Sequence, residues 1–265
     1  MMFNLVIGQY VPLDSVIHRM DPRSKLISVF MFVVIVFLAN NWLTNVLLIL
    51  FCLGGILTSK ISPAFLFRGL RSILIIVLLT FFLNLFFTGG GPLLLHIGWV
   101  RIYQNGLIQS IFITNRILVI IVMTTLLTLT TSPMEITDGM ETLLNPLKKI
   151  KVPVHEFALM MAISLRFIPT LLEETEKIIK AQAARGSDFT SGSLKSRMKA
   201  IVPLLVPLFV SAFKRAEDLA MAMEARGYHG DFGRTRLHKL VWKRRDTLLL
   251  LTMGLLTVAL ILARL

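Results

Sequence analysis

The segment SILIIVLLTFFLNLFF (residues 72–87) decides the fold class of this chain. It contains no charged residue, and it lies within a longer stretch, Pro22 to Met134, that contains no aspartate or glutamate. A helix needs roughly 20 mostly apolar residues to cross the hydrocarbon core of a bilayer. Hydrophobic residues make up 55% of the whole chain, above the roughly 45–50% of ordinary globular proteins. The sequence therefore predicts an all-α, polytopic membrane protein.

Five segments have the composition of membrane-spanning helices, although the first is short and needs residues on either side to reach the length of a span. They are Leu26–Ala39, Trp42–Thr58, Ser72–Phe87, Leu107–Thr131 and Thr247–Leu262. The chain then divides into residues 1–131 with the first four spans, a polar helical domain at 132–245, and the last span at 246–265.

The positions of the basic residues predict the orientation of these spans, because cytoplasmic loops collect lysine and arginine. The domain 132–245 carries 19 of the 28 lysines and arginines. Further basic residues precede the first span or lie between the second and third spans: Arg19, Arg23, Lys25, Lys60, Arg68 and Arg71. The segments on the opposite side of the membrane carry two, Arg101 and Arg264. We therefore expect a cytoplasmic N-terminus and an outer C-terminus.

The net charge of +13 follows from this bias and from attraction to anionic lipid. A nucleic-acid partner is not expected, since that would need a dense basic face with interleaved aromatic residues. The single cysteine, Cys52, lies in a predicted span, where an inert buried thiol is the expected state.

The domain 132–245 contains two apolar pieces, Phe157–Ile168 and Ile201–Phe213, each shorter than a membrane span. We expect them to be buried core or to lie at the cytoplasmic membrane surface. Ser132 and Glu135 around Pro133 form a capping-box pattern that predicts a helix start.

Two long helices are expected in the rest of this domain. The first runs from about Pro169 to Arg185, followed by a break through residue 193, and the second runs from about Ser193 to Arg226 with bends near Pro203 and Pro207. Small residues on one strip of the second helix would let the first approach closely, so we expect the two to cross. The strip consists of Ala212, Ala216, Ala220 and Met223, spaced four, four and three residues apart.

Both long helices end in the same tripeptide, at Ala184-Arg185-Gly186 and at Ala225-Arg226-Gly227. One reading is a helix stop, because glycine takes the left-handed conformation after a helix and arginine complements the negative end of the helix dipole. The other is a recognition device used twice, because an arginine at a helix tip can clamp carboxylates or carbonyls of a partner.

No catalytic pattern accompanies these motifs. The chain lacks a G-x-x-x-x-G-K-[ST] phosphate loop, H-E-x-x-H and G-x-S-x-G, and its five histidines have no metal-ligand spacing. We therefore expect no cofactor, no metal and no enzyme activity. Two alternatives remain: a self-sufficient secondary transporter, which would need intramembrane acids and a repeat, and a membrane-embedded enzyme, for which His155-Glu156 is the neighbouring pair to test.

Three blocks of the sequence resemble the T component of energy-coupling factor (ECF) transporters. They are PLDSVIHRMDPRSKL (12–26), NPLKKIKVPVHEFALMMAISLRFIPTLLEETEKIIKAQAARG (145–186) and AMEARGY (222–228). The resemblance covers almost the whole chain and includes both Ala-Arg-Gly motifs in order; Leu13 departs from it, where related chains often have glycine.

This resemblance implies a transmembrane scaffold of an ABC-type importer for vitamins or metal ions in a prokaryotic cell membrane. Such a scaffold joins a substrate-binding membrane S component to two cytoplasmic ATPases through two crossing coupling helices. Residues 132–245 would then be the coupling domain, with Arg185 and Arg226 each docking to one ATPase. The sequence does not name the substrate, which in this family is chosen by the S component.

Two further sites draw attention outside the coupling domain. Arg116 lies well inside the fourth predicted span, where an arginine is costly in lipid. It either contacts a partner subunit or another helix, or snorkels to a membrane surface. In Asp21-Pro22-Arg23-Ser24-Lys25, Asp21 is expected to cap the first helix, with Arg23 and Lys25 meeting lipid phosphates; packing against the coupling helices is the alternative.

Overall fold

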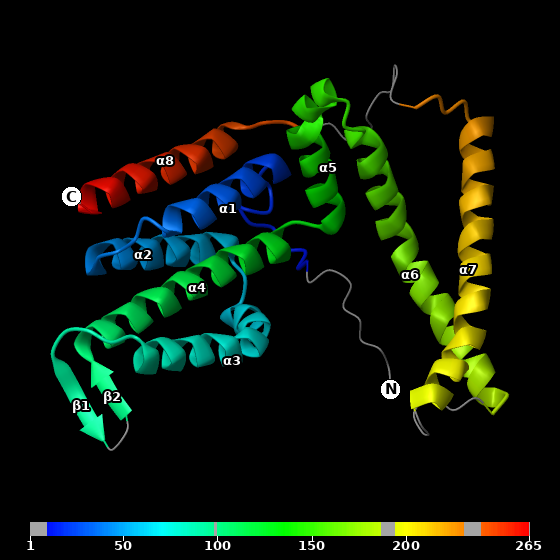
Figure 1. Cartoon of the computed structure of the whole chain (residues 1–265). Helices are drawn as coiled ribbons and strands as arrows, with labels where there is room; N and C mark the ends of the chain where they lie inside the picture. The colour runs from blue at the N-terminus through cyan, green and yellow to red at the C-terminus, as the bar shows by residue number, and fades with distance from the viewer. Residues whose placement is uncertain (1–9, 98–99, 187–193, 231–239, 265) are drawn as a thin grey trace. The chain divides into compact units, whose positions relative to one another are not determined.

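The structure, a computed structural model, describes residues 10–97, 100–186, 194–230 and 240–264. The chain forms two compact units, shown in Figure 1. Unit 1 comprises residues 1–143 and 240–265, and unit 2 comprises residues 144–239. The domain expected at 132–245 thus contains unit 2, whereas the helix that follows Ser132 and the residues from 240 onward belong to unit 1.

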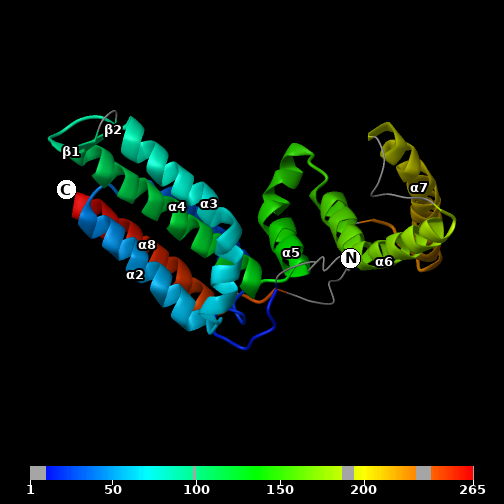
Figure 2. The same cartoon turned by 90° about the horizontal axis from the view of Figure 1, so that it is seen from below.

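Unit 1 is a helical bundle. Its helices are α1 (Pro22–Val36), α2 (Trp42–Ser59), α3 (Pro63–Phe87), α4 (Gln104–Thr130), α5 (Pro133–Leu144) and α8 (Arg244–Arg264). Helix α4 contacts α1, α2 and α3, while α8 contacts α1 and α2. Figures 1 and 2 show α4 beside α3, and Figure 1 shows α8 beside α1, in agreement with their contacts.

The core of unit 1 lies where α1, α2, α4 and α8 meet. Phe32 and Val36 of α1, Leu48 of α2 and Met253 and Leu260 of α8 are fully buried there. The outer faces of these helices are also apolar and remain exposed, as at Phe30 of α1, Leu57 of α2 and Leu255 of α8. An apolar interior beneath an apolar surface is the arrangement expected of helices that pack against each other and face lipid.

Local capping sets several helix ends in unit 1. The carboxylate of Asp21 accepts a hydrogen bond from the backbone N–H of Arg23 at 2.9 Å, which confirms Asp21 as the N-cap of α1. The N–H of Ser132 donates to Glu135 Oε2 at 2.9 Å and the N–H of Glu135 donates to Ser132 Oγ at 3.3 Å. This reciprocal pair confirms the capping box at the start of α5.

The connection between α3 and α4 is not wholly irregular. It contains an antiparallel hairpin of two short strands, β1 (Leu93–Ile97) and β2 (Val100–Tyr103). These strands do not alter the all-α class, because they form no layer with the helices.

Within the described residues, four helices are long and apolar enough to cross a membrane: α2, α4, α6 (Val154–Ala184) and α8. Three of them correspond to predicted spans. The apolar parts of the other two predicted spans are shorter, since α1 has 15 residues and α3 is apolar over Ile73–Phe87. The chain is therefore a multi-pass membrane protein by the length and composition of its helices.

The described part of unit 2 consists of a 3₁₀ helix, η1 (Asn145–Ile150), and two long helices, α6 and α7 (Leu194–Ala225). Helix α7 lies within one residue of the predicted bounds. The predicted start of the other helix at Pro169 is wrong, because Pro169 lies inside α6 and the apolar piece before it belongs to the same 31-residue helix. The predicted break at 187–193 lies outside the described residues.

Candidate functional site

The end of α6 carries the first Ala-Arg-Gly motif. Gly186 has φ +85°, and its N–H donates to the carbonyl oxygen of Ala183 at 3.0 Å. A Cβ atom on Gly186 would meet nothing within 4 Å. The glycine is therefore required for its left-handed backbone, which turns the chain away from the helix axis, and not for lack of space.

The end of α7 repeats this geometry at the second motif. Gly227 has φ +72°, its N–H donates to Glu224 at 2.9 Å, and the N–H of Tyr228 donates to the Met223 carbonyl at 3.0 Å. These two bonds make a Schellman motif, which satisfies carbonyl groups that the helix end leaves open. The helix-stop interpretation of both motifs is thus correct at the level of the backbone.

Both motif arginines remain available to a partner. Arg185 and Arg226 are exposed, and neither makes an ion pair with another residue in the described ranges. Because the helix dipole already places partial negative charge at these ends, each guanidinium is stabilised where it is without an acidic neighbour. A binding role and a helix-ending role are therefore compatible.

A polar contact joins α6 to α7 midway along the pair. Glu174 of α6 pairs with the guanidinium of Arg215 and accepts a hydrogen bond from the hydroxyl of Ser211 at 2.8 Å. Side-chain exposures of 24% for Glu174 and 32% for Arg215 show that the pair is half-buried. We call Glu174, Ser211 and Arg215 the α6–α7 clasp. In the sequence Glu174 cannot be distinguished from an ordinary charge on a helix surface, so no local signal predicts this contact.

The clasp lies at the same distance along the chain from both motifs. The interval from Glu174 to Arg185 equals the interval from Arg215 to Arg226. Each interval makes about three helical turns and spans about 16 Å along the helix axis. Each motif arginine therefore projects from the same side of its helix as its clasp residue. Because α6 and α7 run antiparallel in Figure 1, the two motifs lie at opposite ends of the pair.

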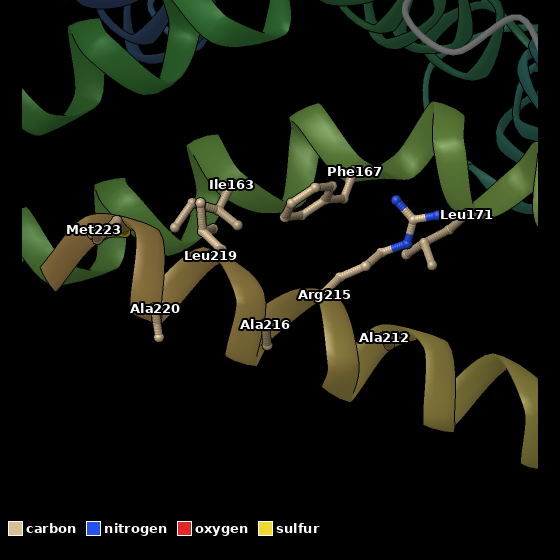
Figure 3. A pocket seen from close by; sticks show the side chains of 9 residues that line it. All are labelled: Ile163, Phe167, Leu171, Ala212, Arg215, Ala216, Leu219, Ala220 and Met223. Carbon is tan, nitrogen blue, oxygen red and sulfur yellow. The ribbon is translucent and has the colours of Figure 1, made fainter. Parts of the chain in front are cut away.

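The strip of small residues on α7 lines a pocket of about 280 Å³ together with Ile163, Phe167 and Leu171 of α6. Within this strip, Ala212 and Met223 are half-buried, whereas Ala216 and Ala220 are exposed. Figure 3 shows the side chains of Arg215 and Leu219 directed toward α6 from the neighbouring strip of α7. The expectation that Ala212, Ala216, Ala220 and Met223 let the helices approach closely stays a prediction.

A second pocket, of about 460 Å³, lies beside the α7 motif. Arg166 of α6 lines it together with Arg215, Asp218 and Arg226 of α7. Arginine predominates over acid here, and Arg215 is already paired with Glu174. This end of the helix pair therefore suits an acidic or carbonyl-rich partner surface.

Arg116 contacts a neighbouring helix of its own chain. Its guanidinium donates to the Ala39 carbonyl at 3.0 Å and lies 5.2 Å from the centroid of the Phe37 ring. The adjacent Asn115 donates to Asn45 of α2 at 2.8 Å. Arg116 thus satisfies a carbonyl just beyond the end of α1, and a role toward a partner subunit stays a prediction.

The expectation that Lys25 meets lipid phosphates is wrong. Lys25 is 4% exposed, and its ammonium donates to the Thr130 carbonyl at 3.0 Å and to Thr131 Oγ1 at 3.3 Å. The carbonyl groups at the C-terminal end of α4 attract this cation, because they carry the negative end of the helix dipole. Arg23 likewise pairs within the chain, with Asp21.

The residues described above lie in the part of the chain that matches known proteins. Residues 14–238 match the CbiQ family, described as cobalt transport protein. The energy-coupling factor transporter transmembrane protein EcfT of Bacillus subtilis is 62% identical over 247 residues, which cover 93% of each chain. The proteins of the same name from Macrococcus caseolyticus and Listeria innocua are 53% and 54% identical, over 96% and 97% of each chain.

Proposed function

Because this chain belongs to the CbiQ/EcfT family of transmembrane components of energy-coupling factor transporters, we propose that it joins two cytoplasmic ATPases to a substrate-binding membrane S component. ATP-driven movement of the ATPases would reach the S component through α6 and α7. The chain would have no catalytic group of its own, and the transported substrate would be a vitamin or a metal ion.

Docking of the ATPases is assigned to the two Ala-Arg-Gly motifs. The single observation that carries this proposal is the repeated geometry: Arg185 and Arg226 are both exposed caps, each followed by a left-handed glycine. A guanidinium at a helix tip can form charge-assisted bonds with carboxylates or carbonyls in a groove. Their position at opposite ends of an antiparallel pair supports one motif for each of two ATPases.

Exposed apolar residues of unit 2 support contact with the S component or the lipid surface. On α7 they cover a wide face: Ile201, Val202, Leu205, Val206, Phe209, Val210 and Phe213. A contiguous apolar face of this kind marks a protein or membrane contact. We place unit 2 on the cytoplasmic side, with the N-terminus cytoplasmic and the C-terminus outside a prokaryotic cell membrane, because the basic residues gather there.

The proposal is tested by co-purification from membranes in mild detergent. The tagged chain is expressed with its ATPase pair as wild type and as Arg185→Glu/Arg226→Glu. Reversing a charge in a desolvated contact costs about 2–5 kcal/mol, so affinity should fall at least roughly 30-fold at each site. The double variant should therefore lose the ATPases.

A matched control is Lys177→Glu/Lys214→Glu, which reverses two charges on the same helices away from their tips. This control should retain the ATPases. Retention by the arginine variant would remove the docking role. A wild-type chain that purifies without any ATPase would instead return attention to a secondary transporter or a membrane-embedded enzyme, where His155→Ala is the first variant to assay.

A further inference from the structure

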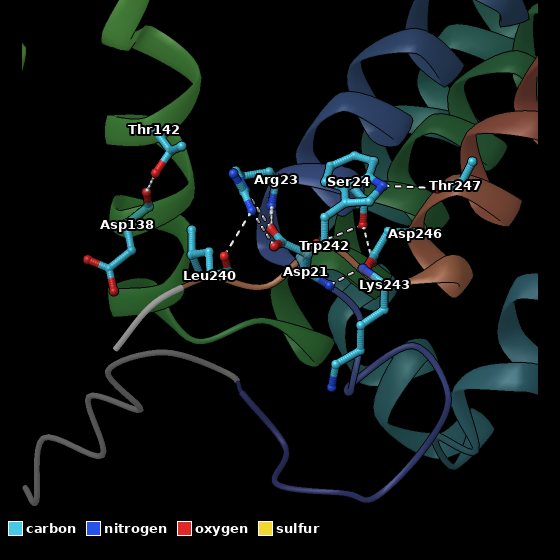
Figure 4. Close-up of polar contacts among 10 residues, drawn as sticks. All are labelled: Asp21, Arg23, Ser24, Asp138, Thr142, Leu240, Trp242, Lys243, Asp246 and Thr247. Atoms are coloured by element: carbon cyan, nitrogen blue, oxygen red, sulfur yellow. Dashed lines mark hydrogen bonds and ion pairs between the residues drawn. The ribbon is translucent and has the colours of Figure 1, made fainter. Parts of the chain in front are cut away.

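The first turn of α1 meets two other segments of unit 1 that lie far away in the sequence. One is α5, which leads out of unit 1, and the other is the segment Leu240–Asp246, through which the chain returns. Figure 4 shows the polar contacts at this place, made by Asp21, Arg23, Ser24, Leu240, Trp242 and Asp246. These six residues together with Gly139 of α5 we call the α1 junction.

Asp246 is the centre of the α1 junction. It is fully buried, and its Oδ1 accepts a hydrogen bond from the N–H of Asp21 at 2.8 Å and lies 2.8 Å from the hydroxyl of Ser24. Its Oδ2 accepts a bond from the N–H of Lys243 at 2.7 Å. The carboxylate thus binds the start of α1 and the start of α8 together. Hydrogen bonds to a charged acceptor in a buried site are among the stronger ones in proteins.

Arg23 makes the second connection to the returning segment. Its guanidinium pairs with Asp21 at 2.8 Å, donates to the Leu240 carbonyl at 3.3 Å and lies 5.8 Å from the centroid of the Trp242 ring. Burial would raise the pKa of Asp21, but hydrogen bonds from the Arg23 side chain and backbone outweigh it and hold that pKa below its usual range. Asp21 is therefore ionised at neutral pH, and the pair is charged.

The outgoing segment is held by close packing. A Cβ atom on Gly139 of α5 would lie 3.1 Å from Leu26 Cδ1 and 3.2 Å from Pro22 Cβ. These distances are tighter than ordinary contacts, so the absence of a side chain lets α5 lie directly against the first turn of α1. Both covalent connections between unit 1 and residues 144–239 therefore contact the N-terminal part of the same helix, α1.

We propose that the α1 junction is where movement of residues 144–239 enters the membrane helices, with Asp246 as the positioning residue. This inference rests on the proposed function, because it takes the ATPases as the source of the movement. The two connections are covalently joined to α4 and to α8, and their contacts with α1 give a displacement of either one a path into that helix as well. Transmission needs a chain of rigid, packed elements, and the buried carboxylate with its three donors supplies that rigidity.

A merely structural anchor would have a different signature. It would stabilise the bundle, and its loss would weaken every membrane helix alike. A transmitting junction would, when weakened, leave the response of α6 and α7 to nucleotide intact and reduce the response of α1. Amide hydrogen exchange separates the two, because it reports each segment in the same sample.

The experiment uses the complex of the full chain with its ATPase pair in mild detergent, with and without ATP and vanadate. In the wild type, nucleotide should change exchange in α6 and α7 and in residues 27–36 of α1. In Asp246→Asn, one oxygen acceptor is replaced by a donor. The nucleotide-dependent change in amide hydrogen exchange of residues 27–36 should therefore fall about tenfold, which lies within the roughly 5–150-fold range of typical coupling between two sites of a protein. The change in α6 and α7 should persist.

Leu256→Ala is the matched control. Leu256 is a buried core residue of α8, the helix that also contains Asp246, and it lies outside the α1 junction. It should keep both responses. Should Asp246→Asn fail to assemble, Ser24→Ala removes a single donor and should give a smaller loss in α1. An unchanged α1 response in both junction variants would overturn this inference while leaving the ATPase-coupling function standing. No nucleotide response in wild-type α6 and α7 would overturn that function, and the inference with it.

Discussion

At the scale of single residues, the two motif glycines serve backbone geometry, whereas we propose that the two motif arginines serve recognition. Gly186 and Gly227 occupy left-handed conformations in open space, so a side chain there would be strained without touching a neighbour. Arg185 and Arg226 lie at the negative ends of their helices and remain exposed. The same tripeptide thus ends a helix and presents a cation at a defined angle.

Gly227→Ala should loosen the end of α7 without changing the charge of the motif. A left-handed alanine costs about 1 kcal/mol, so the N–H of Tyr228 should exchange roughly fivefold faster, because its bond to Met223 depends on that turn. Gly227→Asn is the control, since asparagine tolerates this conformation better, and its exchange should stay near wild type. Equal rates in all three proteins would contradict the backbone role.

At the scale of elements, α6 and α7 are joined by a clasp that divides them into matching arms. Glu174 precedes Arg185, and Arg215 precedes Arg226, by the same interval of about three helical turns. The crossing therefore fixes the position and the facing side of both tips together. A half-buried ion pair with a hydroxyl donor specifies this register better than an apolar contact would, because slippage by one turn would leave buried charges without partners.

Glu174→Arg should separate the arms, because it opposes two guanidinium groups at the clasp. The double variant Glu174→Arg/Arg215→Glu should restore the crossing, since it re-forms the pair in reverse. Spin labels on exposed positions, introduced as Lys180→Cys and Lys214→Cys, measure the result; Cys52 is buried and stays unlabelled. The distance distribution should broaden in the single variant and narrow again in the double variant. A single variant as narrow as wild type would show that the clasp does not set the crossing.

At the scale of the molecule, the distribution of charge and of apolar surface separates the two units. The membrane helices carry apolar side chains inside and outside, whereas unit 2 combines apolar faces with many charges. Helix α6 belongs to both categories: it is long and apolar enough to span, yet it contains Arg166 and a charged second half. Its proposed place on the cytoplasmic side therefore calls for a direct test.

Cysteine accessibility in intact cells provides this test. Lys151→Cys and Ala183→Cys lie before and near the end of α6, and both positions are exposed. A membrane-impermeant maleimide should label neither of them if α6 is cytoplasmic, because the reagent reaches only the outer side. Leu94→Cys in the hairpin between α3 and α4 should be labelled and is the positive control. Labelling at one end of α6 alone would mean that this helix crosses the membrane.

The sequence by itself determined the features that depend on neighbours a few residues away. These are the apolar helices, the caps at Asp21 and Ser132, and the left-handed glycines at the ends of α6 and α7. They are predictable because the groups that satisfy them lie within about one helical turn. The start of α6 was mispredicted for the complementary reason: Pro169 weakens a helix locally, but packing against α7 can maintain the helix through it.

Only the tertiary structure decided where the charged side chains find partners. Asp246 binds Asp21 across 225 residues, Lys25 binds Thr130 across 105, and Glu174 binds Arg215 across 41. In the sequence each resembles an ordinary charge at a membrane or helix surface. Burial changes its chemistry, because a charge removed from water must be paired, and the fold alone brings the partner within reach.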